Sequence, residues 1–168
     1  HERRTKPHLF SWITWTLNSL VIFLAQTVSH GGFGAWPIGG SCLITAYTAV
    51  LAYRHRTDMS IATTDWVFFA IAVAAMMFWL LTSSPLLAVV LLTGSELVGF
   101  GPTFRFTFFH PHEERIGFYF LSSLRNILTI SALEYYSLTT VLYPASKCVV
   151  SIILVMLIAH RRTQPQFR

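Results

Sequence analysis

Long apolar runs separated by short polar connections dominate this chain. The runs cover residues 9–29, 35–53, 66–82, 86–104, 116–135 and 138–160, and each contains few charged residues. An α-helix rises about 1.5 Å per residue, so about 20 apolar residues cross the roughly 30 Å hydrocarbon core of a bilayer. The pattern therefore predicts an all-α integral membrane protein with six visible transmembrane helices.

The amino-acid composition leads to the same class. Apolar residues make up 54% of the 168 residues and charged residues 11%, whereas soluble domains contain about 25% charged residues. The net charge of +5 would suggest nucleic-acid binding in a soluble chain. Here the basic residues lie between apolar runs, where they indicate topology instead. We therefore expect the lipid bilayer, and no nucleic acid, as the surrounding partner.

The basic residues occupy alternate connections between the apolar runs. The connections at residues 30–34, 83–85 and 136–137 contain no Lys or Arg. The other connections and the two ends hold Arg3, Arg4, Lys6, Arg54, Arg56, Arg105, Arg115, Arg161 and Arg162. Because cytoplasmic loops are enriched in Lys and Arg, both ends of this chain, the C-terminus included, are expected in the cytoplasm. The compact loops favour a bacterial cytoplasmic (inner) membrane.

A pair of apolar runs occurs twice in the sequence. Residues 10–18 and 118–126 each begin with an aromatic residue and end with an asparagine, Asn18 or Asn126. An aromatic-proline pair opens the next run in each case, and an arginine follows 17 residues after the proline; these residues are Trp36-Pro37 with Arg54, and Tyr143-Pro144 with Arg161. Internal repeats of this kind are how many transporters are built.

The repeat predicts a division of the chain into three parts. Residues 1–53 would be helices two and three of a first three-helix bundle, residues 54–85 a linker helix, and residues 86–168 a second three-helix repeat. The linker keeps the two repeats parallel. This three-plus-one-plus-three plan has seven helices, so it expects a further helix before His1.

The end of the fourth apolar run has a short motif, Gly101-Pro102-Thr103-Phe104-Arg105, followed by a short polar loop and then by Asn126. With the repeat, this motif resembles the PQ-loop superfamily, which includes the SWEET-like membrane transporters. Pro102 stands where that family has the proline of its PQ pair, and Thr103 replaces the glutamine. The resemblance implies hinge prolines at helix ends, here Pro7, Pro102 and Pro111.

Pro37 and Pro144 are further hinge candidates. Each is expected in the first turn of its helix, where proline is also an ordinary start signal. The residues Gly39-Gly40-Ser41 after Pro37 permit close helix approach or an open cavity.

Three ionisable residues are expected near the middle of the membrane: Glu96, Arg125 and Lys147. A lone charge there costs at least about 2.5–3.5 kcal/mol, so such residues face a bundle interior or a wet cavity and pair with one another. Glu96 and Arg125 are the expected pair, because their helices are consecutive and antiparallel and their depths match, and Lys147 is a candidate to join them. Asn18 and Asn126 are suited to hydrogen-bond a polar solute, or alternatively to join two helices.

Two functions remain open from the sequence. The first is a transporter that moves a small polar solute by alternating access, with a central site of Asn18, Asn126, Glu96, Arg125 and Lys147 and with proton coupling through Glu96. The second is a non-transporting membrane subunit or scaffold, in which the same charges fix helix packing or dock a partner subunit or a second copy.

Other chemistry is not predicted. The segment His110-Pro111-His112-Glu113-Glu114 has no second cluster to complete a metal site and reads as a solvated turn. Cys42 and Cys148 lie inside apolar runs, where cysteine acts as a small hydrophobe, so no disulfide is expected. No nucleophile with a base partner and no phosphate loop is present in the sequence. We therefore expect neither an enzyme nor a cofactor.

Overall fold

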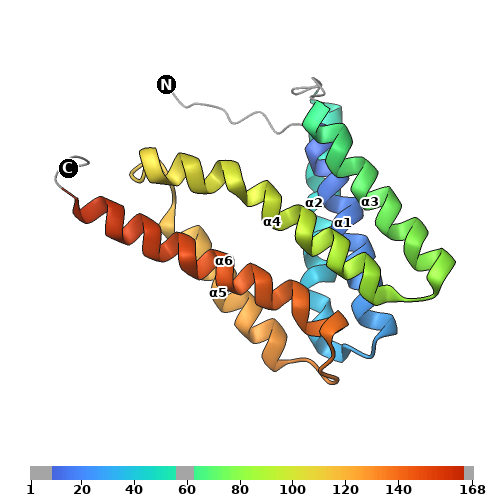
Figure 1. Ribbon diagram of the computed structural model, residues 1–168. Coiled ribbons are helices and arrows are strands. Elements are labelled where there is room, and N and C mark those ends of the chain that lie inside the picture. The colour runs from blue at the N-terminus through green and yellow to red at the C-terminus, as the bar shows by residue number, and fades with distance from the viewer. Residues whose placement is uncertain (1–8, 56–62, 165–168) are drawn as a thin grey trace.

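The computed structural model describes residues 9–55 and 63–164 of the chain. In these residues it has six α-helices, one short 3₁₀ helix and no β-strand (Figure 1). The elements are α1 (Leu9–Val28), η1 (Gly32–Ala35), α2 (Trp36–Arg54), α3 (Thr63–Thr82), α4 (Pro85–Phe109), α5 (Ile116–Ser131) and α6 (Leu138–Thr163). The all-α prediction is confirmed, and each predicted run corresponds to one α-helix.

Four of the helices are long and apolar enough to cross a membrane. They are α1, η1 with α2, α4 and α6. The apolar part of α3, residues 66–82, is shorter, and α5 has 16 residues. The protein thus has helices long and apolar enough for an integral membrane protein, while α5 is shorter than the roughly 20 residues that an upright crossing requires.

Large apolar side chains cover the outer faces of these helices. Leu43 on α2, Leu81 on α3 and Val98 on α4 are 73%, 76% and 72% exposed. Soluble proteins rarely expose contiguous apolar surface of this extent, because apolar area in water is unfavourable. A lipid environment removes that cost.

Two groups of three helices make up the molecule. Helices α1, α2 and α3 lie together, and α4, α5 and α6 lie together. The groups meet where α4 contacts α1 and α3, and where α6 contacts α1. Figure 1 shows α4 and α6 leaning away from α1 and α2 toward the end that carries the C-terminus. The two groups therefore diverge toward the ends of the helices that carry the basic residues.

Two apolar cores explain this divergence. The first joins both groups and includes Val21, Ile22, Ala25, Ile38, Ala72, Ala75, Ala88, Val89, Leu92 and Tyr143. Its residues lie toward the ends that connect α1 to α2 and α3 to α4. Three of its alanines, on α3 and α4, are fully buried, and small residues allow helices to approach closely. The second core, of Tyr119, Val150, Leu154 and Ile158, lies within the α4–α6 group alone. Among the described residues, the buried core that joins the two groups therefore lies toward one end of the molecule.

Two helix ends differ from the sequence prediction. Helix α4 continues to Phe109, beyond the predicted end at Phe104, because its last turn packs on α6: the Arg161 guanidinium lies 3.8 Å from the Phe108 ring centroid, and its Nε donates to the Phe108 carbonyl at 3.1 Å. A cation at a helix C-terminus also interacts favourably with the helix dipole. Helix α5 ends at Ser131, not Tyr135, because the chain turns back there and the Glu134 amide donates to the Gly31 carbonyl at 3.4 Å.

The two repeated prolines have different surroundings. Pro37 lies in the first turn of α2, as predicted. The same prediction is wrong for Pro144, which lies inside α6, because a capping box of Ser137 and Thr140 starts that helix earlier. Proline has no amide hydrogen, so the carbonyl four residues before it, that of Thr140, lacks its helical donor. The fully buried Gln26 of α1 supplies the missing hydrogen bond, with Nε2 3.0 Å from that oxygen.

The helix pairs α1–α2 and α5–α6 share one local contact. The Cys42 thiol of α2 donates to the Thr16 carbonyl of α1 at 3.7 Å, and the Cys148 thiol of α6 donates to the Ser123 carbonyl of α5 at 3.8 Å. Both cysteines are free. The pairs differ in burial, since α2 buries two residues and α6 buries ten. Helix α4 covers α6, and among the described residues no helix covers α2 in the same way.

The Gln26 contact gives a first prediction. Gln26→Leu removes the donor to a buried carbonyl, so we expect a loss of about 1–3 kcal/mol in stability, measured as a lower midpoint of thermal unfolding in detergent. In Pro144→Ala the restored backbone amide bonds to Thr140 itself, and the same Gln26→Leu change should then cost much less. Equal losses in the two backgrounds would contradict this account.

Candidate functional site

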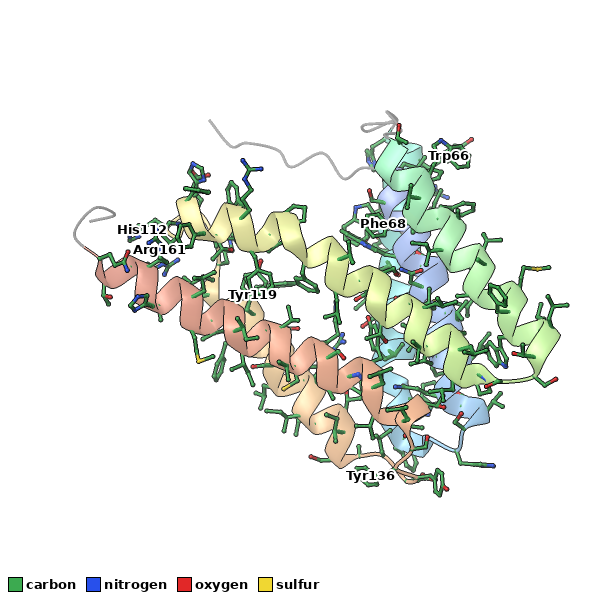
Figure 2. The ribbon with its side chains drawn as sticks, viewed as in Figure 1. Trp66, Phe68, His112, Tyr119, Tyr136 and Arg161 are labelled. Carbon is green, nitrogen blue, oxygen red and sulfur yellow. The ribbon has the colours of Figure 1, made fainter. Side chains whose placement is uncertain are left out.

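A cavity of about 730 Å³ lies between the two helix groups, and every α-helix contributes to its wall. Its lining runs from Ser11 and Phe118, near the basic ends of α1 and α5, to Tyr143 and Lys147 in α6. It contains no residue from the connections at the opposite ends. Figure 2 shows two of the wall residues, Phe68 from the α1–α3 group and Tyr119 from the α4–α6 group. The cavity thus opens where the groups diverge.

The first apolar core closes the deep end of this cavity. Tyr143 belongs to both, since its ring packs in that core and its side chain lines the cavity. The core residues beyond it are almost fully buried, Ile22 and Leu92 among them. The deep end of the cavity, at Tyr143, therefore rests against a buried apolar core, and its lining extends from there toward the basic ends of the helices.

An ion pair lies on the floor of the cavity. Lys147 Nζ is 2.7 Å from Glu96 Oε2, and the side chains are 21% and 16% exposed. The Tyr143 hydroxyl donates to the same carboxylate, at 3.1 Å from Oε1 and 3.3 Å from Oε2. The expected Glu96–Arg125 pair is therefore wrong: Lys147 is the partner. Tyr143 and Lys147 are four residues apart and therefore lie on one face of α6, and both contact Glu96 from that face.

Aromatic rings also surround the Lys147 ammonium. It lies 4.7 Å from the Phe100 ring centroid and 5.8 Å from that of Tyr143. Both distances allow a cation–π attraction. The charges of Glu96 and Lys147 thus balance within the protein, and the pair needs no external ion.

Arg125 lies on the wall formed by α5. Its Nη1 donates to the Ser41 hydroxyl of α2 at 2.6 Å, so it bridges the two helix groups. Its Nε is buried without a hydrogen-bond partner, and no described carboxylate forms an ion pair with its guanidinium. Arg125 is thus a cation that faces the cavity without a counter-charge among the described residues.

The two repeated asparagines are not equivalent. Asn18 lines the cavity, and its Oδ1 is buried without a partner. Asn126 is fully buried and does not line the cavity; its Nδ2 donates to the Ser122 carbonyl within α5 at 2.7 Å. The structure therefore brings four of the five expected site residues to one cavity and leaves Asn126 outside it.

The hinge candidates lie in different settings. Pro7 is outside the described residues. Pro102 lies inside α4, one residue before the cavity-lining Thr103. Pro111 is buried in the α4–α5 connection, and its carbonyl accepts from Arg162 Nε at 3.0 Å. Arg162 also donates to the Glu114 carbonyl at 2.7 Å, and Figure 2 shows its neighbour Arg161 beside His112. The end of α6 therefore holds the His110–Glu114 turn in place.

Several polar side chains of the cavity were not predicted as site residues, among them Tyr143, Ser41 and Ser122. The sequence pattern predicts Tyr143 only as part of the aromatic-proline pair that opens its helix, although its spacing of four residues from Lys147 places both side chains on one helical face. Ser122 likewise precedes Arg125 by three residues on α5. Ser41 had no such signal, because its contact with Arg125 joins α2 to α5 across 84 positions of the chain.

Comparisons of the chain with protein-family models, with curated proteins and with solved structures found no match. The class stated above, an all-helical protein with helices long and apolar enough to cross a membrane and a cavity between them, therefore rests on the sequence and on this geometry.

The ion pair gives a second prediction. Lys147→Met leaves the Glu96 carboxylate without its counter-charge, so we expect a loss of about 2–3 kcal/mol in stability. Adding Glu96→Gln removes the uncompensated charge and should restore most of it. Thermal unfolding of the single and double variants in detergent measures both effects. A double variant less stable than Lys147→Met would contradict the pairing.

Proposed function

We propose that this protein is a membrane transporter that moves a small polar solute by alternating access. The observation that carries the proposal is the cavity of about 730 Å³, lined by all six described α-helices. A site between two helix groups, near mid-membrane, is the arrangement that rocking transporters use. In the proposed topology both chain ends are cytoplasmic, in a bacterial inner membrane, and the cavity is open to the cytoplasm.

The polar groups in the cavity support binding of a hydrated solute. Asn18, Ser41, Arg125 and Lys147 present donors or acceptors to it, and aromatic rings form much of the remaining wall. A pocket with mostly apolar walls and a few placed polar groups is typical of small-molecule sites. We therefore propose Asn18, Glu96, Arg125 and Lys147 as the site, with Ser41 and Tyr143 added from the geometry.

Alternating access would require the closed end to open. The contacts to be broken there are the first apolar core and the Gln26–Thr140 hydrogen bond, which joins α1 to α6. Both connect one helix group to the other. A rocking motion of the three-plus-one-plus-three plan would separate them while the basic ends of the groups approach each other.

Proton coupling would act through Glu96. Its carboxylate lies between Lys147 and the Tyr143 hydroxyl, at the floor of the cavity. Protonation of Glu96 would release Lys147 and weaken the tie between α4 and α6. That would link the charge on one carboxylate to helix movement.

A non-transporting scaffold is the rival function. The internally balanced Glu96–Lys147 pair favours it, because a neutral pair can serve helix packing alone. The two functions differ in whether the cavity becomes accessible from both sides of the membrane in turn or stays accessible from one side.

Thiol labelling tests this difference. In a background of Cys42→Ala and Cys148→Ala, we expect Ser122→Cys, on the cavity wall, to react with a membrane-impermeant thiol reagent. The matched control is Leu128→Cys on the same helix, because Leu128 is 60% exposed on an outer face and should lie in lipid. In a transporter, Ser122→Cys should be labelled from either side of the membrane; in a scaffold, which does not change the side to which the cavity is accessible, it should be labelled from one side only.

A flux assay tests the coupling. Proteoliposomes with an internal pH-sensitive dye should show proton movement when a transported solute is added to one side. Glu96→Gln, which cannot exchange the proton, should abolish that signal, at least about ten-fold, while solute exchange continues. Unchanged transport and unchanged pH dependence in Glu96→Gln would rule out coupling at this residue.

A further inference from the structure

We propose that the solute bound in the cavity is a small organic monoanion whose carboxylate binds Arg125. The inference rests on the proposed transport function and specifies its substrate class. It is drawn from the charge balance of the cavity, from the geometry of Arg125, and from the nature of the surrounding walls.

The cavity has one uncompensated positive charge. Its described ionised side chains are Glu96, Lys147 and Arg125. Glu96 and Lys147 form an ion pair at 2.7 Å and cancel. The Arg125 charge is left without a carboxylate among the described residues, although a charge at this depth is costly unless it is paired. A ligand with one negative charge would make the cavity neutral.

The orientation of Arg125 suits a carboxylate. One of its terminal nitrogens is fixed by the Ser41 hydroxyl at 2.6 Å, which holds the side chain between α2 and α5. Nε is buried and has no partner. A guanidinium presents its N–H groups in a planar fork that matches the two oxygens of a carboxylate. Because Ser41 accepts one hydrogen of Nη1 and Nε is buried, the N–H groups available to such a ligand are the remaining ones on the two terminal nitrogens.

The neighbouring walls indicate an organic body on that carboxylate. Phe100, Phe118 and Tyr119 provide aromatic surface, while the Ser122 and Ser151 hydroxyls, 3.2 Å apart, provide hydrogen-bonding groups beside it. A bare inorganic anion would leave the aromatic surface without a partner. The volume of about 730 Å³ admits an acid of modest size together with water.

Binding to Arg125 would also affect the helix groups. Its contact with Ser41 is a side-chain hydrogen bond between α5 and α2. A carboxylate bound at this bridge contacts the second group through Arg125 and lies next to the first at Ser41. A ligand at this position would therefore contact both helix groups.

The test measures protection of a cavity thiol. The reporter is Ser122→Cys with Cys42→Ala and Cys148→Ala, reacted with an impermeant thiol reagent in liposomes. The probes are three acids, each with its uncharged amide: acetate and acetamide, lactate and lactamide, benzoate and benzamide. Sodium chloride at the same concentration tests an inorganic anion. We expect at least one acid to slow the labelling, and its amide and chloride to do so at least about ten-fold less effectively.

Arg125→Gln should then weaken protection by that acid at least about ten-fold. The matched control is Arg105→Gln, which removes the same charge from an exposed position of α4 that does not line the cavity, and it should leave protection unchanged. If Arg125→Gln does not fold, Arg125→Lys serves instead, because it keeps the charge and loses the planar fork; it should bind the acid several-fold more weakly.

The outcomes separate this inference from the proposed function. A thiol at position 122 that never reacts overturns both. A thiol that reacts, but that acids protect no better than amides or chloride do, overturns the anion inference and leaves the cavity intact. Protection by an acid that is equal with and without the Arg125 substitution assigns the anion elsewhere and also overturns it. Selective protection that is lost with Arg125 and kept with Arg105→Gln supports it.

Discussion

The buried apolar core that joins the two helix groups lies toward one end of the described helices, and the rest of the architecture depends on it. The core around Ile22 and Leu92 joins α1, α2, α3, α4 and α6 on the side of the short connections. On the other side the second core stays within α4–α6. Among the described residues, the second core contains none from α1, α2 or α3, and the cavity occupies the space between the diverging groups.

The proline in α6 connects this closed end to the backbone. Pro144 frees the carbonyl of Thr140, and a side chain from the other helix group, Gln26, satisfies it. A helix defect thus becomes a contact between groups. The contact is a single directional hydrogen bond that water could replace if the end opened, whereas the surrounding core is fixed by packed area. The closed end therefore combines a non-directional core with exchangeable polar contacts, the Gln26–Thr140 and Glu134–Gly31 hydrogen bonds.

The charges in the cavity divide into two kinds. Glu96 and Lys147 compensate each other and, with Tyr143, link α4 to α6 within one group. Arg125 instead contacts Ser41 across the groups and has no carboxylate among the described residues. A balanced pair explains how two charges are tolerated in the membrane. Arg125 is therefore the charged group of the cavity that remains available to bind a ligand.

The sequence by itself determined the class of the protein: an all-α chain, one helix for each apolar run, and Glu96, Arg125, Lys147 and Asn18 as the polar residues of the interior. Those follow from local periodicity and from the cost of charge in hydrocarbon, which act within one helix. Only the tertiary structure decided that Lys147, not Arg125, pairs with Glu96, that Asn126 lies outside the cavity, and that Pro144 is inside a helix. Depth along a helix can be counted from the sequence, but which face meets which neighbour depends on the rotation and tilt of packed helices. Those are set by contacts such as Arg125–Ser41, between residues 84 positions apart.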